Sequence, residues 1–241
     1  MKPYNEQQTK KEQVEAMFDN IAPNYDRLNH ILSFQIDRIW RSRVVRIVRR
    51  LKPRRVLDVA TGTGDLAILL ARKIEGAQIV GVDLSEEMLN VARRKVESAE
   101  LNDRISLEKG DAEGLTTIAT ESVDVATVAF GVRNFEDLEG GLREMYRAIR
   151  RGGKIVVLEF STPRNRLVRW VYAQYSHHLL PAIGGLISKD KQLLLYHYRE
   201  HSNMTDLYKE FRLSNTTRSQ ASKHTYQSNH SHIQIQKTSL D

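Results

Sequence analysis

The sequence predicts an α/β protein with a doubly wound, mostly parallel sheet that is preceded by a helical lid. Two observations predict this fold. From residue 53 to residue 160, short apolar runs alternate with amphipathic stretches, and strands that alternate with helices build a parallel sheet covered on both faces. The first apolar run also leads directly into a glycine turn, which lets a ligand approach bare backbone at the edge of such a sheet.

Periodicity and helix-breaking residues predict the elements in order. An amphipathic helix over 10–32 breaks at Pro23 and resumes as a second short helix, and a helix over 37–51 stops at Pro53. Ser85 is a good N-cap for the helix that follows it. The regular part of the chain contains strand 55–60, helix 65–74, strand 78–83, helix 86–99, strand 105–109, strand 123–130, helix 136–150 and strand 154–160.

We divide the chain into three parts. Residues 1–52 form the N-terminal helical lid, and residues 53–192 form the core, with helices over 167–188 that cover the substrate. Residues 193–241 form a polar tail rich in Ser, Thr, Asn, Gln and His. Five of the eight histidines lie in this tail, but their spacing fits no regular ligand motif, so no metal site is predicted.

Composition excludes several classes of protein. The 241 residues include no cysteine, which rules out disulfides, thiolate metal sites and a cysteine nucleophile. The start is polar and no apolar run approaches the roughly 18 residues that span a bilayer, so we expect a cytoplasmic protein. Eight basic residues lie within 41–55. They indicate a solvated helix face or contact with an anionic membrane, and no nucleic-acid-binding motif accompanies them.

The glycine turn predicts a nucleoside-binding half-site. Gly62, Gly64 and Ala67 satisfy the spacing of the dinucleotide fingerprint. The second strand ends about twenty residues later in Asp83, an acid well placed to accept both ribose hydroxyls. This spacing alone is compatible with NAD and with other nucleosides.

Flanking acids favour a cationic cofactor. Asp58 ends the first strand and Asp65 begins the next helix, where a dinucleotide would place its pyrophosphate. A carboxylate there repels phosphate but attracts the sulfonium and ammonium groups of S-adenosylmethionine, so the acids favour that cofactor over NAD. After the third strand, the Asp111 carboxylate can accept from the adenine amino group while the ring lies against Ala112. These positions share the edge where open α/β sheets bind ligands.

Several segments resemble the class I methyltransferases of menaquinone and ubiquinone biosynthesis. The resemblance covers roughly residues 10–192. Its most specific elements are Phe-Asp-x-Ile-Ala-x-x-Tyr-Asp in the lid and Phe-Gly-Val-Arg-Asn after the fourth strand. The matching segments are 17–26, 28–29, 40–41, 56–65, 81–89, 130–135, 145–153 and 157–160.

The resemblance implies an enzyme that uses S-adenosylmethionine to methylate a ring carbon of a polyprenyl quinol, with demethylmenaquinol as the expected acceptor. A methoxy-polyprenyl-benzoquinol stays an alternative. A homodimer is also expected. One family feature is missing, since Ala129 stands where the family often has a serine that contacts the cofactor. The implied cofactor contacts are Thr63, Asp83, Asp111 and Ala112, with Asp58, Gly62 and Gly64 in the shared loop.

The same resemblance, with the chemistry of the side chains, predicts the catalytic residues. A ring carbon becomes nucleophilic when the neighbouring hydroxyl is ionised. The fixed charge of Arg133 would stabilise the phenolate or lower the pKa of a bound water, and Asn134 would orient that water or the ring oxygen. Tyr25, with Asp26 and Asn29, would close over the cofactor from the lid.

The tail departs from the family, which usually ends in an antiparallel pair of strands that completes a seven-stranded sheet. Because residues 197–241 are polar, we hypothesise an altered or out-of-frame carboxy terminus. If the strands are missing, a sheet edge is exposed. Three other functions stay open. They are a small-molecule methyltransferase with another acceptor, a non-catalytic nucleoside-binding protein of the same fold, and an NAD-dependent oxidoreductase, which Asp65 disfavours.

Overall fold

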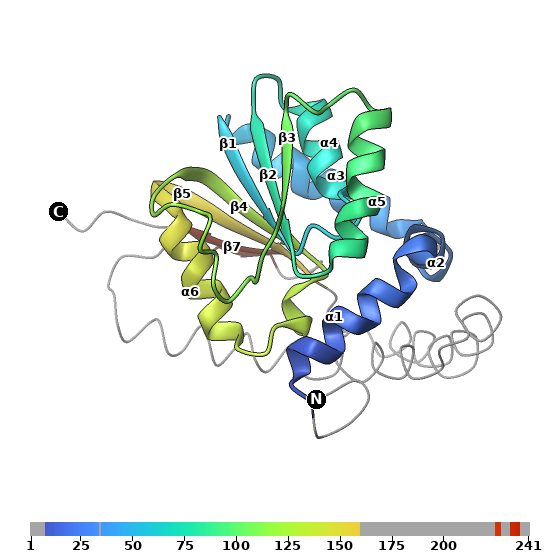
Figure 1. The fold of residues 1–241 in the computed structure, drawn as a ribbon. Helices are drawn as coiled ribbons and strands as arrows, with labels where there is room; N and C mark the ends of the chain where they lie inside the picture. Colours follow the sequence, from blue (N-terminus) through green and yellow to red (C-terminus); the bar gives the residue numbers. More distant parts are fainter. Residues whose placement is uncertain (1–7, 34, 160–224, 228–231, 237–241) are drawn as a thin grey trace, which may run out of the picture.

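A seven-stranded sheet forms the centre of the fold (Figure 1). The computed structural model describes residues 8–33, 35–159, 225–227 and 232–236. The strand order is β3-β2-β1-β4-β5-β7-β6. The strands are β1 (Arg55–Val59), β2 (Gln78–Asp83), β3 (Ile105–Lys109), β4 (Val123–Ala129), β5 (Ile149–Leu158), β6 (Thr225–Gln227) and β7 (His232–Gln236).

The strand order places a ligand-binding crevice between β1 and β4. The strands β1 to β5 are parallel, whereas β7 and β6 join antiparallel at one edge. The chain starts at β1, moves outward to β3, and then returns to build β4 and β5 on the other side of β1. Open α/β sheets bind ligands where this reversal occurs, at the carboxyl ends of the strands. The predicted doubly wound, mostly parallel sheet is therefore confirmed.

Helices cover both faces of the sheet and one of its ends. Figure 1 shows α6 on one face, and α3, α4 and α5 on the other. The lid elements α1, η1 and α2 lie across the end where the carboxyl termini of the strands meet. The helices are α1 (Lys10–Ile21), η1 (Ala22–Asn24), α2 (Tyr25–Leu32), α3 (Ile36–Arg50), α4 (Asp65–Lys73), α5 (Glu86–Ser98), η2 (Val132–Asn134) and α6 (Leu138–Ala148).

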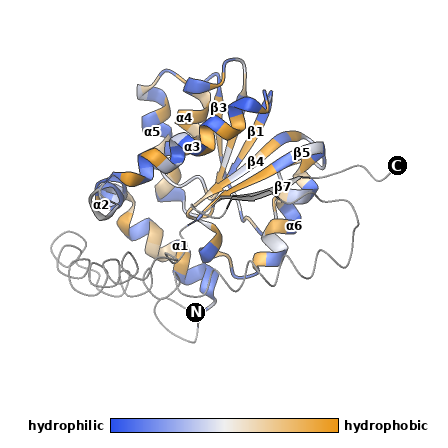
Figure 2. Cartoon of the chain, turned by 180° about the vertical axis from the view of Figure 1, so that it is seen from behind, coloured by the Kyte–Doolittle hydropathy of each residue, from blue (hydrophilic) through white to orange (hydrophobic). Residues whose placement is uncertain are grey.

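Helix α3 packs as part of the core. Its residues Val44 and Val48 are fully buried in the same apolar cluster as Leu70 of α4 and Val56 of β1. The opposite side of α3 is rich in arginine, so the helix is amphipathic, and Figure 2 shows polar residues on the outside of the molecule and apolar strands within. The part of the predicted lid that stands over the sheet end is therefore α1, η1 and α2.

The structure contains an antiparallel strand pair at this end of the sheet, so β5 is not an exposed edge. The structure places β7 against β5, with Ile233 and Ile235 opposite Val157 and Ile155, and β6 pairs with β7. Residues two apart in a strand share one face, and the sequence of β7 alternates isoleucine with polar residues. A composition averaged over forty-odd residues hides such a short alternating run.

The remaining expectations concern the substrate-covering helices and membrane-spanning segments. The helices predicted over 167–188 lie outside the described residues. Within the part of the chain that the structure describes, no helix is long and apolar enough to cross a membrane.

Ending the chain at residue 224 should destabilise the protein, because it removes the strands that cover β5. Each lost ladder hydrogen bond contributes about 1 kcal/mol, so the free energy of unfolding should fall by at least about 2 kcal/mol. Urea unfolding measures this change, and amide exchange should speed up in β5. A chain that ends at residue 236 keeps both strands and serves as the control. Equal unfolding midpoints for the two truncations would contradict the pairing of β5 with β7.

Candidate functional site: a nucleoside cleft under the lid

A cleft lies at the carboxyl ends of β1 to β4, beneath α1. It holds about 740 Å³ of empty space, part of it open to solvent. Each of the four strand ends contributes to its wall, and so does the lid. The contributing residues are Gly62 after β1, Asp83 at the end of β2, Asp111 and Ala112 after β3, Phe130 and Asn134 after β4, and Lys11, Phe18 and Tyr25 from the lid.

Asp83 is held in place by backbone donors. Its carboxylate accepts a hydrogen bond from the Gly62 amide at 2.7 Å and one from the Ser85 amide at 2.9 Å. Burial raises the pKa of Asp83 to about 6, although these amides oppose the shift. The carboxylate is therefore ionised at neutral pH, and each oxygen keeps a lone pair for a further donor. This arrangement suits a pair of ribose hydroxyls, as the sequence predicts.

Asp58 lies below the loop instead of in the cleft. It is 1% exposed and accepts hydrogen bonds from Thr61 at 2.7 Å and Thr127 at 2.6 Å. The parallel register sets Asp58 beside Thr127 of β4, so the carboxylate joins β1, the loop and β4. Burial raises its pKa to about 6, and the two hydroxyl donors lower it. Its position fits a residue that orders the loop, and direct cofactor contact is not supported.

Close backbone approach shapes the cleft between β1 and β4. Ala60 and Phe130 both have positive φ, at 51° and 61°, and left-handed backbone at non-glycine residues concentrates at functional sites. A Cβ added to Gly131 would lie 2.5 Å from the Ala60 Cβ. Gly64 is also left-handed, at 77°, and packs against Ala92 of α5. Glycine at 131 is therefore required by packing, and at 64 by both packing and backbone conformation.

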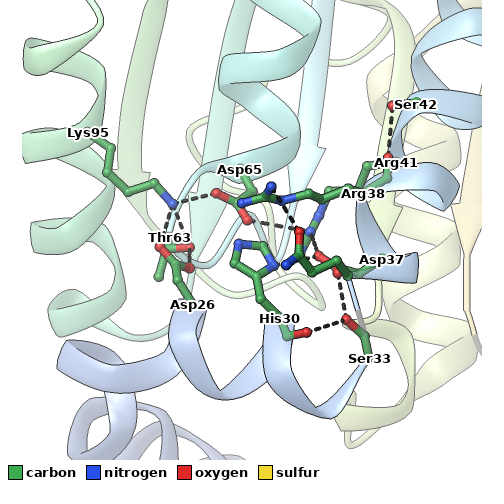
Figure 3. Close-up of polar contacts among 11 residues, drawn as sticks. Asp26, His30, Ser33, Asp37, Arg38, Arg41, Ser42, Thr63, Asp65 and Lys95 are labelled. Atoms are coloured by element: carbon green, nitrogen blue, oxygen red, sulfur yellow. Dashed lines mark hydrogen bonds and ion pairs between the residues drawn. The ribbon is translucent and has the colours of Figure 1, made fainter.

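Thr63 and Asp65 are not among the residues that line the cleft. Figure 3 shows both beside Asp26 and Lys95. The Thr63 hydroxyl donates to Asp26 of α2. Asp65 pairs with Lys95 at 2.5 Å and with Arg41 at 3.4 Å. Burial alone would raise the pKa of Asp65, but these two cations hold it below its usual value.

The prediction that Asp65 faces a cofactor cation is therefore wrong. The first residue of α4 points toward α3 and α5, where the protein supplies its own cations. Asp65 therefore no longer argues against NAD, because Arg41 and Lys95 neutralise its charge.

Arg133 is likewise absent from the cleft wall. It is 5% exposed and donates to Glu159 at 2.9 Å in a buried ion pair. Its neighbour Asn134 lines the cleft, so η2 presents the amide and buries the guanidinium. The direct contact predicted between Arg133 and a phenolate is not supported by this geometry.

Tyr25 and Asn134 do line the cleft, as predicted. Burial raises the pKa of Tyr25, although the charges of Arg41 and Arg133 oppose the shift. The Tyr25 hydroxyl therefore keeps its proton at neutral pH and can donate a hydrogen bond to an oxygen in the cleft.

Lys11 of the lid is a candidate site residue that the sequence prediction missed. It pairs with Asp111 of the predicted adenine site, and Asp111 also accepts from the Glu113 amide at 3.0 Å. The sequence could have indicated this residue, because Lys11, Val14 and Phe18 are spaced so that they share one face of α1. All three line the cleft.

Comparison with known proteins identifies the family. A model of the ubiE/COQ5 methyltransferase family matches residues 6–235. This chain belongs to that family. A Bacteroides fragilis protein named demethylmenaquinone methyltransferase is 46% identical over 81% of this chain and 80% of its own length. A Geotalea daltonii protein named ubiquinone/menaquinone biosynthesis C-methyltransferase is 45% identical over 75% of this chain and 77% of its own.

A solved structure also confirms the predicted fold of this chain. A solved structure described as an S-adenosyl-L-methionine-dependent methyltransferase from Methanococcus maripaludis aligns with a TM-score of 0.61. It covers 98% of this chain and 97% of its own, at 21% identity. The predicted family, fold class and methyltransferase activity are therefore confirmed. Among the described residues, no group of three His, Cys, Asp or Glu side chains is arranged to hold a metal ion.

Affinity for S-adenosylmethionine should fall as the pH drops through about 6, the pKa of Asp83. A protonated carboxyl accepts hydrogen bonds poorly, so affinity should weaken up to about tenfold per pH unit below that value. Isothermal titration between about pH 5 and about pH 8 measures the profile. Asp83→Asn should flatten it, and a profile unchanged by that substitution would assign the titration to Asp58.

Gly131→Ala should destabilise the protein by about 1–3 kcal/mol, because the new methyl group overlaps Ala60. It should also weaken cofactor binding, since β1 and β4 must separate at the cleft. Gly114→Ala is the matched control, as nothing lies within 4 Å of its added Cβ, and it should change stability by less than about 0.5 kcal/mol. Equal thermal unfolding of the two variants would disprove the close approach.

Proposed function

We propose that this protein transfers the methyl group of S-adenosylmethionine to a ring carbon of demethylmenaquinol. The observation that carries the proposal is the meeting of Gly62, Asp83, Asp111 and Ala112 from three strand ends in one cleft. Tyr25 and Asn134 line the same cleft. The relatives named demethylmenaquinone methyltransferase support the choice of acceptor.

The cleft fits the nucleoside of the cofactor. Asp83 keeps lone pairs for two ribose hydroxyls after accepting from Gly62 and Ser85. Asp111 offers a carboxylate for the adenine amino group, and the small side chain of Ala112 leaves room for the ring. When bound, S-adenosylmethionine supplies an electrophilic methyl group.

Tyr25 and Asn134 are positioned for the acceptor. The protonated Tyr25 hydroxyl donates to the ring oxygen that gains negative charge, and the Asn134 amide holds the same oxygen or a water beside it. Phe18 and Phe130 provide aromatic walls for the quinol ring. The Arg133–Glu159 pair anchors η2 and so positions Asn134.

The lid completes the enclosure. The Lys10 ammonium donates to the carbonyls of Arg133 and Phe135, both at 2.8 Å. Asp19 accepts from the Ser85 hydroxyl at 2.5 Å. These contacts hold α1 over the cleft, and a closed lid excludes water from the reacting groups.

One alternative acceptor is favoured by a specific observation. The Geotalea daltonii relative carries a name that covers both ubiquinone and menaquinone biosynthesis, so a methoxy-polyprenyl-benzoquinol is the second candidate. Peripheral contact with an anionic membrane and a homodimer stay predictions.

Labelled S-adenosylmethionine and a demethylmenaquinol analogue should yield a singly methylated ring, identified by mass spectrometry. Tyr25→Phe should lower kcat about 10- to 100-fold, since it removes a hydrogen bond to a charged oxygen. Its KM for S-adenosylmethionine should stay unchanged. Tyr146→Phe, on the exposed side of α6, is the control.

Two outcomes would contradict the proposal. Cofactor binding without methylation of any quinol would indicate a non-catalytic nucleoside-binding protein. A Tyr25→Phe variant that changes only the KM for S-adenosylmethionine would remove Tyr25 from the acceptor site.

A further inference from the structure

A second groove lies outside the cleft, between α2, α3, α4 and α5. It encloses about 1380 Å³ of empty space, which includes open solvent. Its lining contains one acid, Asp65, against six basic side chains. The basic residues are His30, Arg38, Arg41, Arg72, Arg94 and Lys95.

The inner part of the groove is electrostatically satisfied (Figure 3). Asp65 is shared by Arg41 and Lys95. Arg41 also pairs with Asp37, and Lys95 also pairs with Asp26 at 2.7 Å. These residues bind one another and hold the lid to the core, so they do not need a ligand.

The outer rim is different. Arg72 and Arg94 are exposed, and neither forms an ion pair with a described residue. Arg38, also exposed, donates to the neutral amide of Gln35 at 3.2 Å. Three guanidinium groups therefore border the groove without a facing acid, which creates a positive potential that attracts anions.

Exposed apolar side chains lie next to this rim. Ile36 is 41% exposed and Ile39 is 56% exposed, and both flank Arg38 at the start of α3. Residues three apart share one face of a helix. A surface that presents both apolar and cationic side chains suits the headgroup region of an anionic bilayer, which offers phosphate and hydrocarbon together.

The groove also lies close to the catalytic cleft. The Arg41 guanidinium, which lines the groove, is 5.7 Å from the centre of the Phe130 ring, and Phe130 lines the cleft. One pair of side chains therefore separates the two. A bilayer held at the groove would lie near the site that must receive a polyprenyl lipid.

We propose that the start of α3 and the outer rim of the groove bind the surface of an anionic phospholipid membrane. This α3 face consists of Ile36, Arg38, Ile39, Arg72 and Arg94. The proposal rests on the proposed function in one respect, since a polyprenyl acceptor dissolves in the bilayer. Ionic attraction holds the face to the headgroups, and the two isoleucines enter the apolar boundary.

Flotation with phosphatidylcholine vesicles, with and without about one third phosphatidylglycerol, tests the proposal. The wild-type protein should bind the anionic vesicles and release them in high salt. Each basic side chain near an anionic surface strengthens binding roughly fivefold, so R72E/R94E should weaken it at least about 25-fold. The milder R72Q/R94Q and the uncharged I36S/I39S should each weaken it less.

R143E/R151E is the matched control. It changes the net charge equally, at exposed positions on α6 and β5, and should retain most of the binding. Affinity for S-adenosylmethionine, measured by titration, should be unchanged in R72E/R94E, which shows that the variant is folded.

Three results would overturn the proposal. They are equal binding to neutral and anionic vesicles, equal loss in R72E/R94E and R143E/R151E, and binding of an RNA oligonucleotide without binding of anionic vesicles. The same experiments distinguish failure of the proposed function from failure of the membrane proposal. A wild-type protein that binds anionic vesicles but methylates no soluble quinol analogue would refute the function alone, whereas methylation without vesicle binding would refute the α3 face alone.

Discussion

The junction between β1 and β4 is the constraint on which the site depends. Asp58 joins the two strands by accepting from Thr61 and Thr127, and Gly131 allows the backbone after β4 to contact Ala60. This junction aims the Gly62 amide at Asp83, 2.7 Å away. A buried carboxylate that lost its hydroxyl donors would strongly destabilise the fold. The geometry of the loop and of the ribose site therefore depends on the contacts of Asp58.

The lid is joined to this framework by an apolar cluster and by ion pairs. Met17, Ile21 and Ala22 of the lid are buried together with Met88 of α5. Lys95 of α5 contacts both Asp26 of α2 and Asp65 of α4, while Lys11 of α1 pairs with Asp111. Partly exposed ion pairs are individually weak, so the lid does not depend on them alone. The acids near the lid pair with Arg41 and Lys95. Arg72 and Arg94, on the outer rim of the groove, stay exposed.

Much of the site was predictable because strand ends in a parallel sheet converge. Gly62, Asp83, Asp111 and Ala112 follow three separate strands and meet in one cleft, as their positions in the chain predict. The errors share a physical cause. Motif position does not reveal the direction of a side chain, and Asp65 and Arg133 each turn toward an oppositely charged partner far along the chain.

The sequence by itself determined the alternation of strands and helices, the family and the nucleoside edge, because each depends on local periodicity or on short motifs. Tertiary structure alone decided which charges are free. Arg41, Asp65 and Arg133 are compensated by partners from other elements, whereas Arg72 and Arg94 remain exposed on the rim. It also decided that a polar tail supplies β7, because a strand can pair through its backbone with β5 on one side and β6 on the other.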